Sequence, residues 1–513
     1  MSKKFEDART FSDGSEIETE LCIIGSGAAG ITIAREFALT GIKTCLLEAG
    51  GMSIDPAVED ASDIRALGRN YAVSRTRLRY FGGTTNHWGG HCVPLEPHDF
   101  EAKPWIPHSG WPIGFADIEP HYRKAYGVLG LGDYDTTPEQ ISQEVGLPFI
   151  AWDNRVVRTQ LSRYNRVRFG LAFGDALDAA ENIRVILYAD ASELHMEDAG
   201  SRTVTSVTAH SPSGKSFRVR ARRFVIAGGG IESARLLLMS NRDRPAGLGN
   251  QSDALGRYFM DHLWYPSGIL TPSDVTNVPQ LYSEEVRYRD IAVRAHLVLS
   301  PEASEASEIG RFRAEIRTLS HLHDSMRNLS HGSFSADDLI RVAGQPYMAG
   351  NTFACRENSP RDYLYLQNYI EQVPNPQSRV LLGPGRDAYG RPEAQLDWQL
   401  SAMDQKTVVQ AHYAIATEAG ATNFGRMRID VPENPAVYLE TAVGGAHHLG
   451  TTRMSARPQD GVVDQDCRVH GTNNLYVASS SVFPTGGYAN PTLTIVALSL
   501  RLSEHIKKSY REK

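Results

Sequence analysis

The segment Glu18–Gly51 reads ETELCIIGSGAAGITIAREFALTGIKTCLLEAGG and sets the fold class of the chain. A short apolar run, Leu21–Ile24, leads into a glycine-rich turn. The pattern of Ile31–Leu39 is helical, Gly41 ends it, and Lys43–Leu47 is a second apolar run. Short apolar runs around a helical segment are typical of buried parallel strands. The segment therefore predicts a strand–turn–helix–strand unit.

The turn inside this unit has the spacing of a dinucleotide-binding loop. Gly25 allows the tight turn, Gly27 lets a pyrophosphate approach the backbone, and Gly30 lets the helix pack closely. The free N–H groups at the helix start favour phosphate. Glu48, at the end of the second run, is placed to accept hydrogen bonds from ribose hydroxyls. FAD, NAD and a crossover without a ligand all remain open for this unit alone. The predicted binding residues are Gly25, Ser26, Gly27, Ala28, Ala29, Gly30, Glu48 and Ala49.

A second glycine-rich stretch, Phe81–Gly90 (FGGTTNHWGG), surrounds a histidine and a tryptophan. Glycine removes the Cβ where another group comes close. We therefore expect some group to come close to this stretch, with His87 and Trp88 beside it. The predicted contacts are Gly82, Gly83, Thr84, Asn86, His87 and Trp88.

The nucleotide fold is predicted to open near the N terminus and to close near the C terminus. Strand-type runs lie in Asn182–His195 and Val204–Ala227, followed by a helical pattern in Ile231–Ser240. Asn473–Ser479 is a further buried strand, and Pro491–Lys508 is a long amphipathic helix.

Between about 266 and 440 the pattern changes to β-type alternation, which predicts a separate, mostly antiparallel sheet. We therefore predict an α/β Rossmann-like, discontinuous nucleotide-binding domain and an α+β substrate-binding domain with a mostly antiparallel sheet. The predicted ranges are 15–110, 180–265 and 440–510 for the first, and 111–179 and 266–439 for the second. The aromatics expected to stack on a substrate are Tyr282, Tyr363, Tyr365 and Tyr369.

Composition and charge exclude several classes. A net charge of -7 argues against nucleic-acid binding. The basic run Arg75–Arg79 is short and is interpreted as a solvated segment. Five scattered cysteines without CxxC spacing predict a reducing compartment and no metal site. With no signal-type start and no apolar stretch of membrane-spanning length, the expected location is the cytoplasm.

Two late segments place titratable and amide side chains beside glycines. They are Gly444–Met454 (GGAHHLGTTRM) and Ser480–Leu500 (SSVFPTGGYANPTLTIVALSL). A histidine suits proton abstraction from an alcohol, because its ordinary pKa of about 6.5 lies near working pH. A carboxamide can hold the alcohol oxygen without adding charge.

Taken in order, these motifs resemble the glucose–methanol–choline (GMC) oxidoreductases. The match includes GSGAAG, FGGTTNHWGG, GWPIGFADIEPHY, AGGGIESARLLLMS, LGRYFMDH, EQVPNPQSRV and both late segments. The motifs look closest to pyranose oxidase-like and sugar dehydrogenase-like members. The resemblance implies bound FAD and oxidation of a CH–OH group to a carbonyl.

The resemblance also implies the roles of particular residues. His447 matches the histidine that faces the flavin N5 position, and Asn490 matches its polar partner. In some members the histidine matching His87 is covalently bonded to the flavin, so a covalent link through His87 is a possible feature of this chain. Further cofactor contacts are expected at Ala191, Ala227, Ser480, Asn490, Pro491 and Thr492.

Several alternatives stay open. His448 is the alternative base, and Asn490 is alternatively a turn or cap residue before Pro491. Other histidines, including His91 and His262, are interpreted as surface or packing residues. The expected substrate is a small alcohol or carbohydrate: a sugar, glycoside, amino sugar or polyol. The electron acceptor is oxygen or another, unidentified one. The rival functions are an NAD-dependent dehydrogenase and a non-catalytic flavoprotein.

Overall fold

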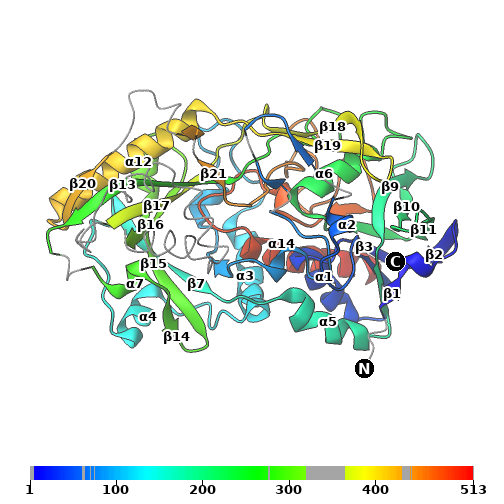
Figure 1. Ribbon diagram of the computed structural model, residues 1–513, viewed down its shortest axis with the longest axis horizontal. Coiled ribbons are helices and arrows are strands. Elements are labelled where there is room, and N and C mark those ends of the chain that lie inside the picture. Colours follow the sequence, from blue (N-terminus) through cyan, green and yellow to red (C-terminus); the bar gives the residue numbers. More distant parts are fainter. Residues whose placement is uncertain are drawn as a thin grey trace.

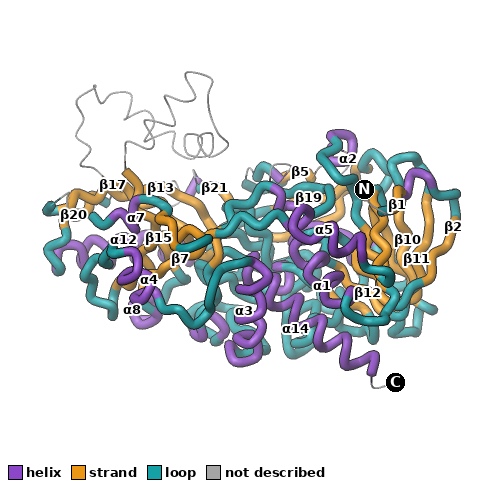
Figure 2. The backbone as a smooth tube through the Cα atoms, turned by 90° about the horizontal axis from the view of Figure 1, so that it is seen from below, coloured by secondary structure: helices purple, strands orange, loops and turns teal. Residues whose placement is uncertain are grey.

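The structure is a computed structural model that describes residues 5–60, 64–69, 71–73, 76–274, 278–318, 364–429, 439–440 and 442–511. Figure 1 shows an elongated molecule with a parallel sheet and its helices at one end and a large antiparallel sheet at the other. The two chain ends both lie at the first of these ends (Figures 1 and 2).

A parallel sheet with the order β1-β8-β4-β3-β12-β22 forms the centre of the first half. The bounds of its strands are β1 Glu6–Asp7, β3 Leu21–Ile24, β4 Thr44–Leu47, β8 Ile183–Leu187, β12 Arg223–Ile226 and β22 Leu475–Val477. Every residue of β3, β4, β12 and β22 is buried. Strands covered on both faces carry continuous apolar runs, which is why the sequence shows no alternation there.

Helices from distant parts of the chain cover this sheet. Their bounds are α1 Ala28–Ala38, α3 Phe115–Leu129, α5 Phe169–Ala179, α6 Gly229–Met239 and α14 Thr492–Arg511. Helix α14 packs against both α1 and α3, so the last helix closes the fold that the first one opens. Figure 2 shows α3 and α14 side by side.

A smaller sheet with the order β2-β11-β10-β9 flanks the parallel one. Its strands are β2 Ser15–Glu18, β9 Asp190–Met196, β10 Val204–His210 and β11 Ser216–Arg220. The strand-type run that begins at Val204 forms a hairpin, because β10 and β11 pair antiparallel. The single strand-type run Asn182–His195 is in fact two strands, β8 and β9, in two different sheets.

The second half is built on an antiparallel sheet with the order β20-β13-β17-β16-β15-β7-β6, to which β14 and β21 add. The bounds are β6 His91–Cys92, β7 Val157–Tyr164, β13 His262–Pro272, β14 Val286–Tyr288, β15 Ile291–Leu299, β16 Phe312–Thr318, β17 Leu364–Glu371, β20 Gly425–Arg428 and β21 Val443–Gly444. Helix α12, Ala402–Ala421, packs across β7, β16, β17 and β20.

Shorter elements complete the description. These are α2 Pro56–Asp60, α4 Pro138–Val145, α7 Gln280–Ser283, α8 Pro301–Ala306, η1 Ala8–Thr10, η3 Gly83–Asn86, η4 Pro97–Phe100 and η6 Ser480–Val482.

Two strands expected in the large sheet belong elsewhere. Strands β18, Arg379–Arg386, and β19, Pro392–Asp397, form a hairpin that pairs through β19 with β5, Ile64–Ala66. Helix α6 packs against β18, so this hairpin lies on the nucleotide-binding half. The β alternation was recognised correctly, but alternation does not state which partner a strand takes.

The three described aromatic residues that were expected to stack on a substrate are buried or in contact with other side chains. Tyr282 is fully buried, and its hydroxyl lies at the Thr159 hydroxyl and accepts from the Ile150 amide. Tyr369 stacks on Trp264 with ring centroids 6.0 Å apart, and Tyr365 is 1% exposed. Tyr363 lies outside the described residues. The stacking expectation is wrong for Tyr282, because packing of the sheet uses its whole ring.

The predicted fold class, a Rossmann-like part joined to a mostly antiparallel second part, is confirmed. The domain boundaries remain predictions. Helix α5, placed in the second domain by the sequence, packs on α1, and β6 and β21, placed in the first, pair within the large sheet. In the described part of the chain, no helix combines the length and the apolar character that a membrane crossing requires.

Candidate active site

One cavity of about 840 Å³ runs from the glycine turn after β3 to the loops before α14. That volume is near the upper end of the roughly 300–1,000 Å³ range of ligand sites, which suits a large ligand such as a dinucleotide. It is lined by the turn after β3, the ends of β4 and β12, the stretch Phe81–Gly90, and residues near His447 and Asn490.

The glycine turn has the geometry of a phosphate cradle. Gly25 has φ +105°, and a Cβ there would lie 2.6 Å from the Ala227 carbonyl oxygen. A Cβ on Gly30 would lie 1.9 Å from the Gly25 carbonyl oxygen, whereas a Cβ on Gly27 meets nothing within 4 Å. Gly25 and Gly30 therefore serve the packing of the turn, and Gly27 faces open space. No side chain caps the start of α1, so its first amide groups are available to an anion.

Glu48 is held in place by the turn itself. Its Oε2 accepts hydrogen bonds from the amide and the hydroxyl of Ser26, at 3.0 and 2.6 Å. Its Oε1 accepts from the Gly50 amide at 3.1 Å. Because a carboxylate offers about four acceptor positions, one remains for a ligand hydroxyl.

The stretch Phe81–Gly90 closes over the glycine turn. A Cβ on Gly83 would lie 3.1 Å from the Gly27 Cα, so the two loops touch. Thr84, His87 and Trp88 line the cavity, and the indole N–H of Trp88 donates to the Val167 carbonyl oxygen at 2.9 Å. The loop thus presents one titratable ring and one fixed indole to the ligand space.

Three of the residues predicted to contact the cofactor do not line the cavity: Gly30, Gly82 and Asn86. Gly82 has φ +97°, and the Asn86 amide donates to the Phe81 carbonyl oxygen at 3.0 Å. These residues stabilise the loop conformations on the side that faces away from the cavity. The other predicted positions border the cavity: Gly25, Ser26, Gly27, Ala28, Ala29, Glu48, Ala49, Gly83, Thr84, His87, Trp88, Ala191, Ala227, His447, Ser480, Asn490, Pro491 and Thr492.

His447 and Asn490 meet at the far end of the cavity. The Asn490 Nδ2 lies 3.1 Å from the His447 Nε2. The other end of the carboxamide, Oδ1, accepts a hydrogen bond from the Arg313 Nη1 at 3.1 Å. Asn490 is therefore not used as a cap before Pro491. Burial, together with the positive charge of Arg313 and the neighbouring histidines, holds the pKa of His447 well below its ordinary value.

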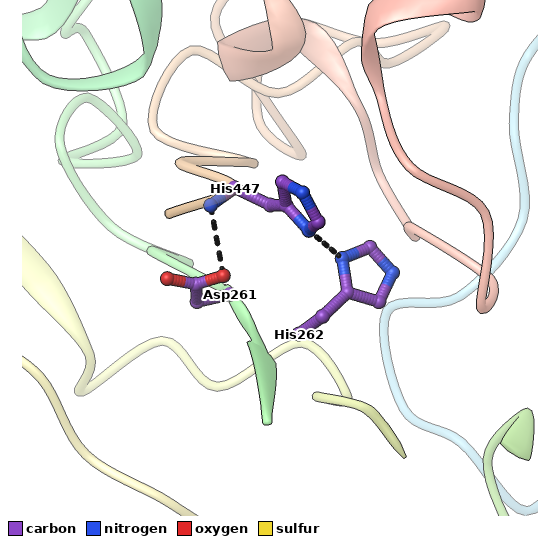
Figure 3. Close-up of side chains that lie close together, drawn as sticks. All are labelled: Asp261, His262 and His447. Carbon is purple, nitrogen blue, oxygen red and sulfur yellow. Dashed lines mark hydrogen bonds between the residues drawn. The ribbon is translucent and has the colours of Figure 1, made fainter. Parts of the chain in front are cut away.

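His262 lies directly behind His447. Their Nδ1 atoms are 2.9 Å apart (Figure 3), and the Nε2 of His262 lies 2.9 Å from the Gly487 carbonyl oxygen. His262 is 2% exposed, and its burial lowers its pKa to about 4. His262 is therefore not a surface residue, and besides packing it contacts the ring of His447. Its position in the motif LGRYFMDH was the signal that could have found it.

Asp261 fixes the backbone that carries His447. Its carboxylate accepts from the amides of His447 and Ala446, at 2.9 and 3.1 Å, and from the Tyr71 hydroxyl. Figure 3 shows the carboxylate below the backbone of His447 rather than beside its ring. Asp261, His262 and His447 form a metal-type cluster by composition. The carboxylate oxygens are engaged in three hydrogen bonds, so the geometry is that of a hydrogen-bonded support.

His91 also lines the cavity, contrary to its interpretation as a surface or packing residue. Its ring stacks on Tyr164 at 4.5 Å and on His296 at 5.1 Å between centroids. The Arg313 Nη1 lies 3.2 Å from its Nε2. Burial and the charge of Arg313 hold the pKa of His91 well below its ordinary value.

The basic run Arg75–Arg79 is not a solvated segment where the structure describes it; Arg75 lies outside the described residues. Arg79 is 8% exposed and pairs with Asp190 at 2.9 Å, and Arg77 pairs with Glu232. Both arginines border the cavity. The acidic partners come from β9 and α6, so a short basic run alone could not reveal this pairing.

A glycine turn on a parallel sheet, a long cavity and a histidine–carboxamide pair at its far end define a dinucleotide-dependent oxidoreductase. Comparisons with known proteins place it more closely. The family model described as GMC oxidoreductase matches residues 374–499. The fructose dehydrogenase large subunit of Gluconobacter japonicus is 25% identical over 97% of this chain and 99% of its own. Paromamine 6'-oxidase of Streptomyces fradiae is 26% identical over 95% of this chain and 91% of its own.

Among solved structures, pyridoxine 4-oxidase from Mesorbium loti matches 96% of this chain and 99% of its own, with a TM-score of 0.59 and 16% identity. That likeness supports the fold. The GMC oxidoreductase match over residues 374–499 is to the family that the ordered motifs predicted, and the relatives that match over almost the whole chain are named dehydrogenases and oxidases. Members of this family are FAD-binding flavoproteins.

Proposed function

We propose that this protein binds FAD in the cavity and oxidises a CH–OH group of a sugar, glycoside, amino sugar or polyol to a carbonyl, with His447 as the base. The observation that carries the proposal is the 3.1 Å approach of the Asn490 Nδ2 to the His447 Nε2 at one end of the cavity. A donor and an acceptor facing each other there suit a hydroxyl group, which needs both.

The cavity fits the cofactor in its chemistry. Gly27 and the uncapped start of α1 suit a pyrophosphate. Glu48 has an acceptor position left for a ribose hydroxyl, and its charge disfavours a 2′-phosphate. His87 and Trp88 would hold the flat ring system. When bound, FAD supplies the acceptor for the hydride that leaves the substrate carbon.

The protein's own residues handle the proton. The substrate hydroxyl would take the place of the direct contact between the two side chains, donating to the His447 Nε2 and accepting from the Asn490 Nδ2. As the O–H bond breaks, its proton moves to Nε2 and its electron pair forms the carbonyl π bond while hydride leaves the carbon. The lowered pKa of His447 keeps the imidazole neutral, so it is ready to accept that proton. Asn490 holds the oxygen in line without adding charge.

The names of the relatives support a carbohydrate or polyol substrate. They include a fructose dehydrogenase large subunit, a paromamine 6'-oxidase, a C-glycoside 3-oxidase and a 2-methyl-1,2-propanediol dehydrogenase. Since both oxidases and dehydrogenases occur among them, oxygen and another electron acceptor both remain to be tested. The sparse cysteines support the cytoplasm as location, and Cys22, Cys45, Cys92 and Cys467 are buried without disulfides.

The deciding experiment is a visible absorbance spectrum of the purified protein, followed by acid precipitation. A yellow protein with a flavin absorbance band at about 450 nm supports FAD, and a colourless one supports the NAD-dependent alternative. Colour that stays in the acid pellet would indicate a covalent flavin, for which we propose His87 as the attachment residue. The matched control is His87→Ala, which should release the flavin into the supernatant.

A second measurement tests the substrate class. The protein is mixed anaerobically with a panel of sugars, amino sugars, polyols and simple alcohols while flavin bleaching is followed. Bleaching by carbohydrates supports the proposal, and bleaching only by simple alcohols removes the sugar assignment. A yellow protein that no alcohol bleaches would support the non-catalytic flavoprotein. Reoxidation by air separates oxidase from dehydrogenase.

A further inference from the structure

Five groups form one continuous hydrogen-bonded chain through the active site. The Arg313 Nη1 lies 3.1 Å from the Asn490 Oδ1, and the Asn490 Nδ2 lies 3.1 Å from the His447 Nε2. The Nδ1 atoms of His447 and His262 are 2.9 Å apart, and the His262 Nε2 lies 2.9 Å from the Gly487 carbonyl oxygen. This series of hydrogen bonds joins β16, the start of β13 and two loops that are far apart in the sequence.

The groups at the two ends of this hydrogen-bonded series decide which atom donates and which accepts in each contact. A guanidinium group can only donate, and a backbone carbonyl oxygen can only accept. The Asn490 Oδ1 therefore accepts from Arg313, which turns its Nδ2 toward His447. At the other end, His262 must carry its hydrogen on Nε2. Its Nδ1 is then the acceptor.

We propose that Arg313 and His262 are positioning residues that hold His447 in one tautomer, with hydrogen on Nδ1 and a lone pair on Nε2. This inference rests on the proposed function, because Nε2 is the atom that would take the substrate proton. Of the two neutral tautomers of His447, only this one gives every contact in the chain a donor and an acceptor. The other would set the Nε2–H of His447 against the N–H of Asn490.

The reversed arrangement is disfavoured at both ends. Rotating the Asn490 carboxamide would place its NH₂ against the Arg313 guanidinium, leaving donors facing each other. Arg313 is fully buried, and its Nε and Nη2 have no hydrogen-bond partner among the described residues. A buried donor that loses its acceptor pays the cost of its desolvation. Without Asn490 as acceptor, Nη1 would keep only its contact with the His91 Nε2 at 3.2 Å, so the Asn490 contact is costly to lose.

The charge of Arg313 acts in the same direction. No carboxylate of the described chain lies within ion-pair distance of its guanidinium, which packs 4.1 Å from the centroid of the Tyr369 ring. Burial of the site, and to a smaller extent the charge of Arg313, lowers the pKa values of His91, His262 and His447. The neutral imidazole is thereby the resting form of His447.

The acceptor end is anchored separately. The Gly487 amide donates to the Glu371 Oε1 at 2.8 Å, and Glu371 is 3% exposed. The Glu371 Oε2 also accepts from the Arg311 amide at 2.8 Å. The carbonyl of Gly487 is thus part of a braced loop, which makes it a fixed acceptor for His262 rather than one that can turn away.

The direct test is the tautomer of His447 in the FAD-loaded enzyme. Protein labelled with ¹⁵N at histidine is compared with the labelled His447→Asn variant, so that the two ring signals of His447 are assigned by difference. Bonded hydrogen separates the ¹⁵N shifts of the two ring nitrogens. We expect hydrogen on Nδ1 and none on Nε2. Hydrogen on Nε2, or an even mixture of the two tautomers, would overturn the inference.

Variants of His262 test its role. His262→Leu removes the acceptor, and we expect kcat to fall by about 10²-fold, the lower end of a general-base contribution, with KM little changed. His262→Gln keeps an acceptor and a donor, and should recover most of the loss. The matched control is His412→Leu, another buried histidine whose pKa is lowered to about 4 and whose partner is Ser267.

The outcomes separate clearly. Equal kcat in His262→Leu and wild type, or equal losses in His262→Leu and His412→Leu, would contradict a positioning role. Arg313→Met should shift the ¹⁵N signals of His447 toward the Nε2–H tautomer, and Arg313→Lys should restore them. If His262→Leu does not fold, the tautomer of wild-type His447 and the spectra of Arg313→Met and Arg313→Lys still test the inference. An enzyme that oxidises no alcohol would refute the proposed function, while the tautomer result would still stand or fall by itself.

Discussion

His447 and His448 are neighbours in the sequence, yet their rings contact different partners. His447 donates from Nδ1, whereas His448 donates from Nε2. The ring of His447 meets His262 and Asn490. The His448 Nε2 lies 3.1 Å from the Thr76 hydroxyl. That hydroxyl already donates to the Val73 carbonyl oxygen at 2.8 Å. His448 therefore carries its hydrogen on Nε2, and only His447 offers a lone pair there.

Replacing His447 by alanine should abolish most turnover while flavin binding stays intact. The expected fall in kcat is at least about 10²-fold, because a positioned base contributes that much or more. The measurements are the flavin content and the rate of anaerobic flavin bleaching. His448→Asn is the control and should keep turnover within a few-fold of wild type. Near-normal turnover in His447→Ala would instead assign the base to His448.

Asn490 should tolerate loss of its side chain better than a change in its charge. Asn490→Ala removes one donor to the substrate oxygen, with an expected loss of about 10- to 100-fold in kcat/KM, as for a single hydrogen bond to a developing charge. Asn490→Asp places an acceptor opposite the His447 Nε2, which favours protonated His447 and removes the base. Steady-state kinetics of the two variants are compared. Turnover of the aspartate variant at or above that of the alanine variant would contradict this account.

The nucleotide end of the site could be predicted from local sequence. Strand β3 begins and ends at the expected residues, Leu21 and Ile24, and α1 starts at Ala28, within the predicted glycine turn. Periodicity, glycine and the residue after a strand are local signals, and short-range geometry follows from them. Gly30, Gly82 and Asn86, which were predicted to contact the cofactor but do not line the cavity, show the limit of this kind of prediction. A motif gives the positions of a loop but not which of them face the ligand.

The supports of the catalytic pair depend on contacts that no local pattern encodes. His262 is 185 residues from His447, and Arg313 is 177 residues from Asn490. The run at Arg77 and Arg79 was misinterpreted for the same reason, since its acidic partners come from other elements. A buried ionic or imidazole group looks like a surface group in the sequence until its partner is known.

Buried neutral histidines predict a loss of stability in mild acid. The folded-state pKa values of His262 and His412 are lowered to about 4, and that of His448 to about 3, chiefly by burial. The unfolded chain titrates near 6.5, so between about pH 6.5 and 4 it binds protons that the folded protein does not. The contribution of these histidines to the free energy of unfolding therefore falls as pH falls, by up to about 1.4 kcal/mol per pH unit for each histidine.

His412→Gln isolates one of these contributions outside the active site. Its unfolding free energy should depend less steeply on pH than that of wild type between about pH 6 and 4, by up to about 1.4 kcal/mol per unit. Asp261 and Asp404, whose pKa values burial raises to about 6, act with the opposite sign in the same pH range, and both are common to the two proteins. The measurement is urea unfolding at a series of pH values. Parallel curves for the two proteins would contradict the burial of a neutral imidazole at this position.

The two glycines of the nucleotide turn should fail in different ways when changed to alanine. Gly27 has open space where a Cβ would lie, so Gly27→Ala should be as stable as the wild-type apoprotein. It should bind FAD more weakly, because the methyl group would take the place of the pyrophosphate. Gly25 has φ +105°, and a Cβ there would lie 2.6 Å from the Ala227 carbonyl oxygen. Gly25→Ala should therefore lose roughly 1–3 kcal/mol of stability. Flavin titration and thermal unfolding of the apoproteins separate the two effects. Unchanged flavin affinity in Gly27→Ala would show that the phosphates lie elsewhere, and an unchanged melting temperature in Gly25→Ala would show that the turn can relax around a side chain.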